Sequence, residues 1–186
     1  MADRVRAAFD AVPREGFLPA RARGRAAYDG PIGIGHGQTN SQPWTVRQML
    51  TLLDARPGQQ VLDVGAGSGW TTALLGHLVG PEGRVRGVEV VPELADWGAA
   101  NVRATGQTWA TVEPAVPHVL GLPAHAPYDR VLVSAEPRQL PHELVDQVAD
   151  GGRMVIPVAG EMLLVVREGS EVEVTRHGHY RFVPLV

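Results

Sequence analysis

The chain has 186 residues, of which 44% are hydrophobic and 20% charged, as is typical of a globular domain of ordinary size. Its formal net charge of -3 argues against a general nucleic-acid surface, and its lack of cysteine excludes disulfides, thiolate nucleophiles and thiolate metal sites. The first residues lead into no apolar signal segment, and no run reaches membrane-spanning length. We therefore expect residues 1–186 to form one cytoplasmic domain without nucleic-acid, membrane or metal partners.

Residues 1–55 are expected to form two helices joined by a long loop. Apolar residues at helical spacing predict a helix over residues 3–12, with Asp3 as its N-cap, and a second helix that begins near Pro43. Residues 13–43 lose this periodicity and accumulate glycine, although apolar side chains interrupt them. Because a loop of this length in a small domain is usually functional, we expect it to form a lid across one end of a sheet.

Residues 56–186 are expected to form the ligand-binding α/β core. Strands are predicted over residues 61–64, 84–89, 109–112, 128–134, 153–158, 162–167 and 171–176, and helices from residue 70, over 92–104 and over 140–149. Alternating strands and helices followed by strands alone predict a mostly parallel, twisted sheet with helices on both faces and antiparallel C-terminal strands. In such Rossmann-like folds, ligands bind outside the C-terminal ends of the strands.

The most informative stretch is the predicted strand that runs into the turn at Gly65, Gly67 and Gly69 and then into a helix. Trp70 occupies the place of the third glycine of a dinucleotide-binding fingerprint, which weakens a pyrophosphate interpretation. Asp63 ends the strand, where a carboxylate suits a cationic amine, and Glu89 could accept hydrogen bonds from two ribose hydroxyls.

An acid, a G-x-G-x-G turn and a second acid form the pattern of class I S-adenosylmethionine-dependent methyltransferases. The less specific interpretation is an ordinary glycine-rich strand-to-helix turn, with Asp63 and Glu89 as solvated strand ends. The agreement of length, spacing and both acids favours the methyltransferase interpretation.

The most polar part of the predicted lid is residues 35–43, with the sequence GHGQTNSQP. Ser41 is well placed as the N-cap of the following helix, with Pro43 in the first turn. His36 is interpreted as a hydrogen-bonding loop residue, because the sequence identifies no acid to pair with it.

Residues 12–19, residues 35–43 and the glycine-rich turn together resemble protein-L-isoaspartate O-methyltransferases, and the similarity continues through residues 128–133, 151–158 and 181–185. Asn40 stands where that family generally carries an apolar residue. By this resemblance, Ser41 would be the active-site serine. The resemblance also implies that substrate contacts come from Gln38, Thr39 and Val183. It further implies that S-adenosylmethionine is bound by Asp63, Gly65, Ala66, Gly67, Gly69, Glu89 and Glu113, the last in place of an aspartate near the adenine.

The resemblance implies methyl transfer from S-adenosylmethionine to the carboxylate of isoaspartyl residues in damaged proteins or peptides. The ester formed in this way closes to a succinimide, so the reaction repairs proteins. Two alternatives remain open at this stage: a carboxylate methyltransferase dedicated to one peptide partner, and a catalytically weak interaction module that binds the cofactor poorly or not at all.

Overall fold

The computed structural model describes residues 2–185. The N-terminal part contains α1 (Ala2–Ala11), η1 (Arg14–Phe17), η2 (Ala20–Arg25), β1 (Ile32–Gly35), β2 (Gln38–Asn40) and α2 (Pro43–Leu53). It is followed by β3 (Gln60–Val64), α3 (Trp70–Val79), β4 (Arg84–Glu89), α4 (Pro92–Ala104), β5 (Ala110–Pro114), η3 (Pro123–His125) and β6 (Tyr128–Val133). The chain ends with α5 (His142–Val145), β7 (Val148–Val158), β8 (Glu161–Glu168) and β9 (Glu171–His179). No helix among these residues is long and apolar enough to cross a membrane.

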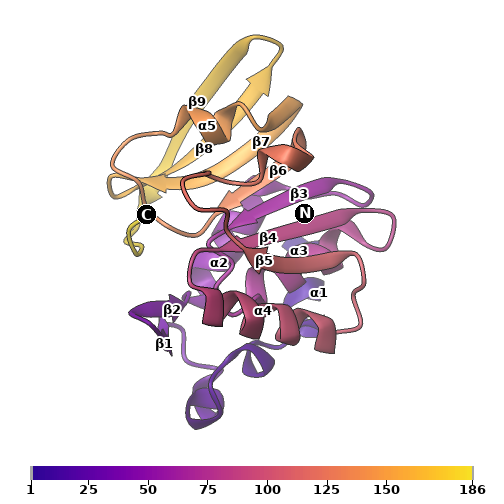
Figure 1. Ribbon diagram of the computed structural model, residues 1–186, viewed down its shortest axis with the longest axis vertical. Helices are drawn as coiled ribbons and strands as arrows, with labels where there is room; N and C mark the ends of the chain where they lie inside the picture. Colours follow the sequence, from indigo (N-terminus) through magenta and orange to yellow (C-terminus); the bar gives the residue numbers. More distant parts are fainter. Residues whose placement is uncertain (1, 186) are drawn as a thin grey trace.

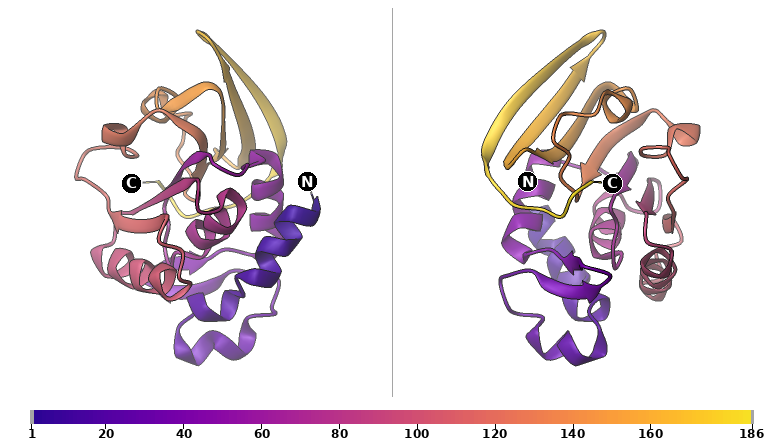
Figure 2. Two further views of the ribbon diagram at one scale, coloured as in Figure 1. Left: turned by 90° about the vertical axis from the view of Figure 1, so that its right-hand side faces the viewer. Right: turned by 60° about the vertical axis from the view of Figure 1, so that its left-hand side comes forward.

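Seven strands form one sheet in the order β5-β4-β3-β6-β7-β8-β9. Strands β3 to β7 pair in parallel, whereas β8 and β9 are antiparallel, as predicted. The β8–β9 hairpin projects from the body of the molecule, and the chain then returns toward the middle of the sheet (Figures 1 and 2). Because β4 and β6 flank β3 on opposite sides, the connections after β3 and β6 diverge there and leave room for a ligand.

Helices cover the two faces of the sheet unequally. One hydrophobic core joins α1, α2, α3 and part of α4 to the sheet, through residues such as Leu50, Leu74 and Val102. The opposite core contains Tyr128 and Leu144 and is covered mainly by α5 and by irregular chain. Side chains along β3 alternate between these cores, so Val61 and Asp63 face the helices and Leu62 and Val64 face the other side.

Two local predictions were wrong in detail. Helix α1 begins at Ala2, so Asp3 lies in its first turn and is not its N-cap. The predicted helix over residues 140–149 is only α5, and β7 already begins at Val148. The Gln147 side chain donates to the carbonyls of Leu120 and Glu143 and accepts from the Leu122 N–H, which ties the chain down where a longer helix was expected.

The predicted lid, residues 13–43, is more regular than its sequence indicated. It contains the 3-10 helices η1 and η2 and the β1–β2 hairpin. The hairpin turns at His36 and Gly37, both of which have positive φ angles. Buried Phe17 and Leu18 anchor the segment, so it is an ordered structure whose hairpin extends beside the sheet (Figure 1).

Candidate active site

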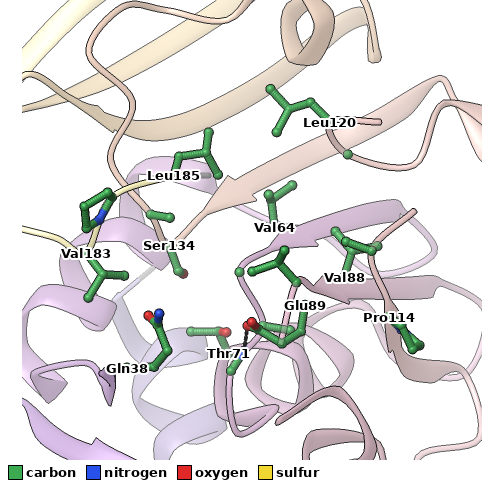
Figure 3. A pocket seen from close by; sticks show the side chains of 18 of the residues that line it. Gln38, Val64, Thr71, Val88, Glu89, Pro114, Leu120, Ser134, Val183 and Leu185 are labelled. Carbon is green, nitrogen blue, oxygen red and sulfur yellow. Dashed lines mark hydrogen bonds between the residues drawn. The ribbon is translucent and has the colours of Figure 1, made fainter. Parts of the chain in front are cut away.

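A cavity of about 730 Å³ opens at the C-terminal ends of β3, β4, β5 and β6. One wall carries Val64, Val88, Glu89 and Pro114 from the parallel strands (Figure 3). The opposite wall is formed by the lid hairpin, the start of the segment after β6 and the C-terminal segment, represented in Figure 3 by Gln38, Ser134, Val183 and Leu185. The cavity therefore lies between the ends of the parallel strands and the segment predicted to be a lid.

The turn after β3 is in direct backbone contact with α4. Gly65, Gly67 and Gly69 all have positive φ angles, of 78°, 53° and 83°. A Cβ atom on Gly69 would lie only 2.7 Å from the carbonyl oxygen of Gly98 in α4, and a Cβ atom on Gly98 would lie 2.6 Å from the Gly67 carbonyl oxygen. Glycine is therefore required on both sides of this contact.

Replacing Gly98 by alanine should displace the turn, because backbone atoms cannot move away cheaply. We expect a loss of about 1 to 3 kcal/mol in the free energy of unfolding, measured by urea denaturation, together with weaker ligand binding. The matched control is Gly24→Ala, since a Cβ atom there meets nothing within 4 Å and Gly24 has no positive φ angle. Equal stability of the two variants would contradict the contact.

Glu89 directs a fixed carboxylate toward the cavity. It is 5% exposed and lines the cavity at the end of β4. Its Oε2 accepts the Gly67 N–H at 2.8 Å, and its Oε1 accepts the Val91 N–H at 3.0 Å. Each carboxylate oxygen keeps further acceptor capacity, so Glu89 can bind a ligand diol while it holds the glycine-rich turn in place.

Asp63 is not among the residues that line the cavity, and its contact with the cofactor stays a prediction. It is fully buried, and its Oδ2 accepts hydrogen bonds from the hydroxyls of Thr71 and Thr72, both at 2.7 Å. The side chain faces α3 because it alternates with Val64, which lines the cavity. Asp63 thus fixes the start of α3, and Thr71 lines the cavity instead.

The buried Asp63 should make stability depend on pH. Burial raises the pKa of its carboxyl from 3.8 to about 6, although hydrogen bonds from Thr72 and Thr71 oppose the shift. The folded state therefore binds a proton between about pH 4 and pH 6 that the unfolded state does not, so the free energy of unfolding falls as the pH rises through this window. Above about pH 6 the full cost of the buried charge is present.

Asp63→Asn should remove this pH dependence, because its amide oxygen can still accept from both threonine hydroxyls. At pH 8 we expect the variant to be more stable by about 1 to 2 kcal/mol, and below about pH 4 to have lost that advantage. Urea denaturation at several pH values measures both effects. A constant stability difference across the whole range would contradict the assignment.

Glu113 is not among the residues that line the cavity, and its contact with the cofactor stays a prediction. Val112 belongs to the core under the helices, so Glu113 faces the opposite side of the sheet. The cavity wall is formed instead by Pro114 and by the turn over residues 116–119. In that turn, His118 has a φ angle of 63° and the Val119 N–H donates to the Val116 carbonyl at 3.0 Å. The sequence of this turn does not indicate it, because residues 116–119 contain no glycine.

The residues predicted to form the acceptor wall lie side by side along the main cavity. Gln38, Thr39, Asn40 and Ser41 all line the main cavity. A smaller groove of about 270 Å³ adjoins it, and Thr39, Ser41, Ser134 and Val183 border both spaces. Ser41 therefore lies where an extended molecule in the groove would meet a ligand in the main cavity.

The alternative role of Ser41 as the N-cap of α2 is wrong. Gln42 is the N-cap residue, and its side chain makes no capping bond. Asp29 supplies the acceptor instead, since its Oδ1 accepts the Trp44 N–H at 2.9 Å. The hydroxyl of Ser41 is thus not required to begin the helix.

The C-terminal segment over residues 180–185 is held against the cavity by Glu136. The Glu136 carboxylate accepts the Phe182 N–H at 3.1 Å. Its backbone N–H donates to the Val183 carbonyl at 2.8 Å, and its carbonyl accepts the Leu185 N–H at 3.0 Å. Sequence analysis could not predict this role, because Phe182 lies 46 residues from Glu136. Residues 2–185 contain no group of three or more acidic or histidine side chains that could hold a metal ion.

The sheet order, the glycine-rich turn and the acid at the end of β4 define a class I methyltransferase fold. The match to the family model for protein-L-isoaspartate(D-aspartate) O-methyltransferase extends over residues 1–186. The chain belongs to this family, as its sequence resemblance implied.

Individual relatives agree with this assignment. A protein-L-isoaspartate O-methyltransferase from Aeropyrum pernix is 45% identical over 194 residues, which cover 98% of this chain and 72% of that protein. A solved protein-L-isoaspartate O-methyltransferase has a TM-score of 0.90 at 23% identity and is matched over 99% of this chain and 61% of its own. A putative enzyme of the same name from Plasmodium falciparum, solved with S-adenosyl-L-homocysteine, has a TM-score of 0.85 at 22% identity, over 99% of this chain and 90% of its own.

Proposed function

We propose that the chain transfers a methyl group from S-adenosylmethionine to the carboxylate of L-isoaspartyl residues in damaged proteins and peptides. The observation that best supports this proposal is the position of Ser41, which borders both the main cavity and the adjoining groove. Family membership over the whole chain gives the reaction. The experiment is to measure the transfer of labelled methyl groups to an isoaspartyl peptide. Absence of label in the peptide would contradict the proposal.

The residues of the main cavity fit the cofactor. The glycine-rich turn allows close approach of a ligand to the backbone, and the Glu89 carboxylate is positioned to accept hydrogen bonds from ribose hydroxyls. Ala66 lies in the same turn and lines the cavity together with Gly65 and Gly67. When bound, S-adenosylmethionine supplies a methyl group attached to a positively charged sulfur. We propose Gly65, Ala66, Gly67 and Glu89 as its contacts, and Gly69 as a residue that shapes the turn.

The protein needs little acid–base chemistry for this reaction. A carboxylate is already ionised at neutral pH, so its oxygen can attack without a general base. The task of the protein is to align that oxygen with the methyl group and to exclude water. We propose that the Ser41 hydroxyl donates to the acceptor carboxylate, and that Gln38, Thr39 and Val183 border the substrate.

Ser41→Ala should lower turnover at least about tenfold while cofactor affinity stays nearly unchanged. Because Ser41 does not cap α2, we expect the free energy of unfolding to change by less than about 0.5 kcal/mol. Steady-state kinetics, calorimetry with S-adenosylhomocysteine and urea denaturation measure these three quantities. The control is Thr51→Ala, which removes a hydroxyl that donates to the Arg47 carbonyl on α2, away from the cavity. Normal turnover by folded Ser41→Ala would remove Ser41 from the catalytic assignment.

The remaining parts of the proposal concern organisation and location. We propose that residues 1–55 and 56–186 belong to one domain, because α1 and α2 share a hydrophobic core with α3 and the sheet. We propose that the protein acts in the cytoplasm and that its partners are isoaspartyl proteins or peptides.

A further inference from the structure

A buried polar chain links the lid to the glycine-rich turn. Asn40 is 4% exposed and lies at the end of β2, between the lining residues Thr39 and Ser41. Its Oδ1 accepts the Arg14 Nε–H at 2.6 Å, and its Nδ2 donates to the Ser68 hydroxyl at 3.1 Å. The side chain of Asn40 thus connects the N-terminal segment with the turn after β3.

Arg14 fixes the lid end of this chain. The guanidinium group donates to the carbonyls of Tyr28, Gly30 and Ser41, at 2.8, 2.9 and 2.9 Å, and also to the carbonyl of Asn40 at 3.0 Å. These bonds hold both ends of the β1–β2 hairpin to one rigid cation. A displacement of Asn40 is therefore transmitted to the backbone of Ser41.

Ser68 fixes the other end. It is 2% exposed, lines the cavity and lies in the turn between Gly67 and Gly69. Its carbonyl accepts a hydrogen bond from the Asn101 side chain of α4 at 2.9 Å. The turn therefore has two side-chain attachments at Ser68, one to the lid through Asn40 and one to α4 through Asn101. Only the first can transmit the position of the turn to the acceptor wall.

We propose that Asn40 is a positioning residue that couples occupancy of the cofactor turn to the geometry of the acceptor wall at Ser41. A ligand that restricts the motion of the turn also restricts Ser68. The hydrogen bond between Ser68 and Asn40 then restricts the motion of the lid. Since coupling between two sites is reciprocal, an acceptor peptide bound against the lid should tighten cofactor binding by the same factor. This inference rests on the proposed function only for the identity of the acceptor.

The first test uses hydrogen exchange and needs no acceptor. S-adenosylhomocysteine should slow amide exchange over residues 32–41 in the wild-type protein. In Asn40→Leu, which keeps the volume but removes both hydrogen bonds, this slowing should decrease at least about fivefold. Ser68→Ala breaks the same link from the other side and should lose the protection equally. If Asn40→Leu does not fold, Ser68→Ala alone decides the question.

The matched control is Asn101→Ala, which releases Ser68 from α4 but leaves its bond to Asn40 intact. This variant is expected to bind the cofactor more weakly, while its bound form still protects residues 32–41. Undiminished protection in Asn40→Leu or Ser68→Ala would overturn the proposal. Equal loss of protection in Asn101→Ala would also overturn it, since general loosening of the turn would then explain the effect.

The second test measures the coupling itself. The dissociation constant of an isoaspartyl peptide is measured with and without saturating S-adenosylhomocysteine, and the ratio cancels direct effects on cofactor affinity. We expect a ratio of about five or more in the wild-type protein and a ratio near one in Asn40→Leu. A wild-type protein that binds no isoaspartyl peptide would count against the proposed function, whereas the exchange test would still decide the role of Asn40.

Discussion

Replacing Glu89 by alanine should weaken the binding of S-adenosylmethionine by about 2 to 4 kcal/mol, since hydrogen bonds to a charged group each contribute about 1.5 to 3 kcal/mol before compensation by water. The loss of binding free energy should lie near the upper end of this range. Alanine also leaves the N–H groups of Gly67 and Val91 without the carboxylate that now holds them. Calorimetry with S-adenosylhomocysteine measures the loss.

Glu93→Ala is the control for this prediction. Glu93 is an exposed acid in the first turn of α4, only four positions after Glu89, and it does not line the cavity. Its removal changes the net charge by the same amount and should leave affinity unchanged. If folded Glu89→Ala bound the cofactor as tightly as Glu93→Ala did, Glu89 would not be a cofactor contact.

Glu89 and the glycine-rich turn could be predicted because their signals are local. A strand followed by glycines that adopt positive φ angles, and then by an apolar helix, specifies both a turn and the end of the sheet where a ligand binds. The next parallel strand must end beside that turn, so the acid that closes it lines the same cavity. Parallel pairing thus explains why Glu89 lines the cavity, and its contact with the cofactor stays a proposal.

Asp63 and Glu113 lie near strand ends beside the cavity but are not among its lining residues. Because successive side chains along a strand alternate between the two faces of the sheet, Asp63 faces the helices and Glu113 faces the side of Val64 and Val88. The hydroxyls of Thr71 and Thr72 direct Asp63 toward α3. For Glu113, the structure places Pro114 opposite Glu89 in the strand register. A residue type at a strand end therefore predicts the neighbourhood of a site better than it predicts a contact.

The lid illustrates a second limit. Its order depends on Arg14, whose hydrogen bonds reach up to 27 residues along the chain, and on Asp29, which supplies the acceptor that Ser41 was expected to provide for α2. No periodic pattern encodes such bonds. The residues that the family resemblance implied as the acceptor site do line the cavity, and their contacts with substrate stay a proposal; they are Gln38, Thr39, Ser41 and Val183.

The second large effect that we expect is a difference in methylation rate between isoaspartyl and aspartyl acceptors. An isoaspartyl residue differs from an aspartyl residue by one methylene, which moves from the side chain to the main chain and brings the free carboxylate closer to the backbone. A site that holds both the peptide backbone and the carboxylate must distinguish these two distances. We propose that the groove beside Ser41, bordered by residues 181–183, takes the peptide backbone, and that the carboxylate enters the main cavity.

We therefore expect methylation of an isoaspartyl peptide to be at least about a hundredfold faster, in kcat/KM, than that of its aspartyl isomer, which corresponds to about 2.7 kcal/mol in transition-state binding. The measurement compares two synthetic peptides of one sequence that differ only in this linkage. Ser41→Ala should lower both rates, because the hydroxyl orients the carboxylate of either isomer. Several unrelated peptide sequences should give the same preference, since recognition through the backbone depends little on side chains. Equal rates for the two isomers, or transfer to one particular peptide alone, would instead favour an enzyme dedicated to a single partner.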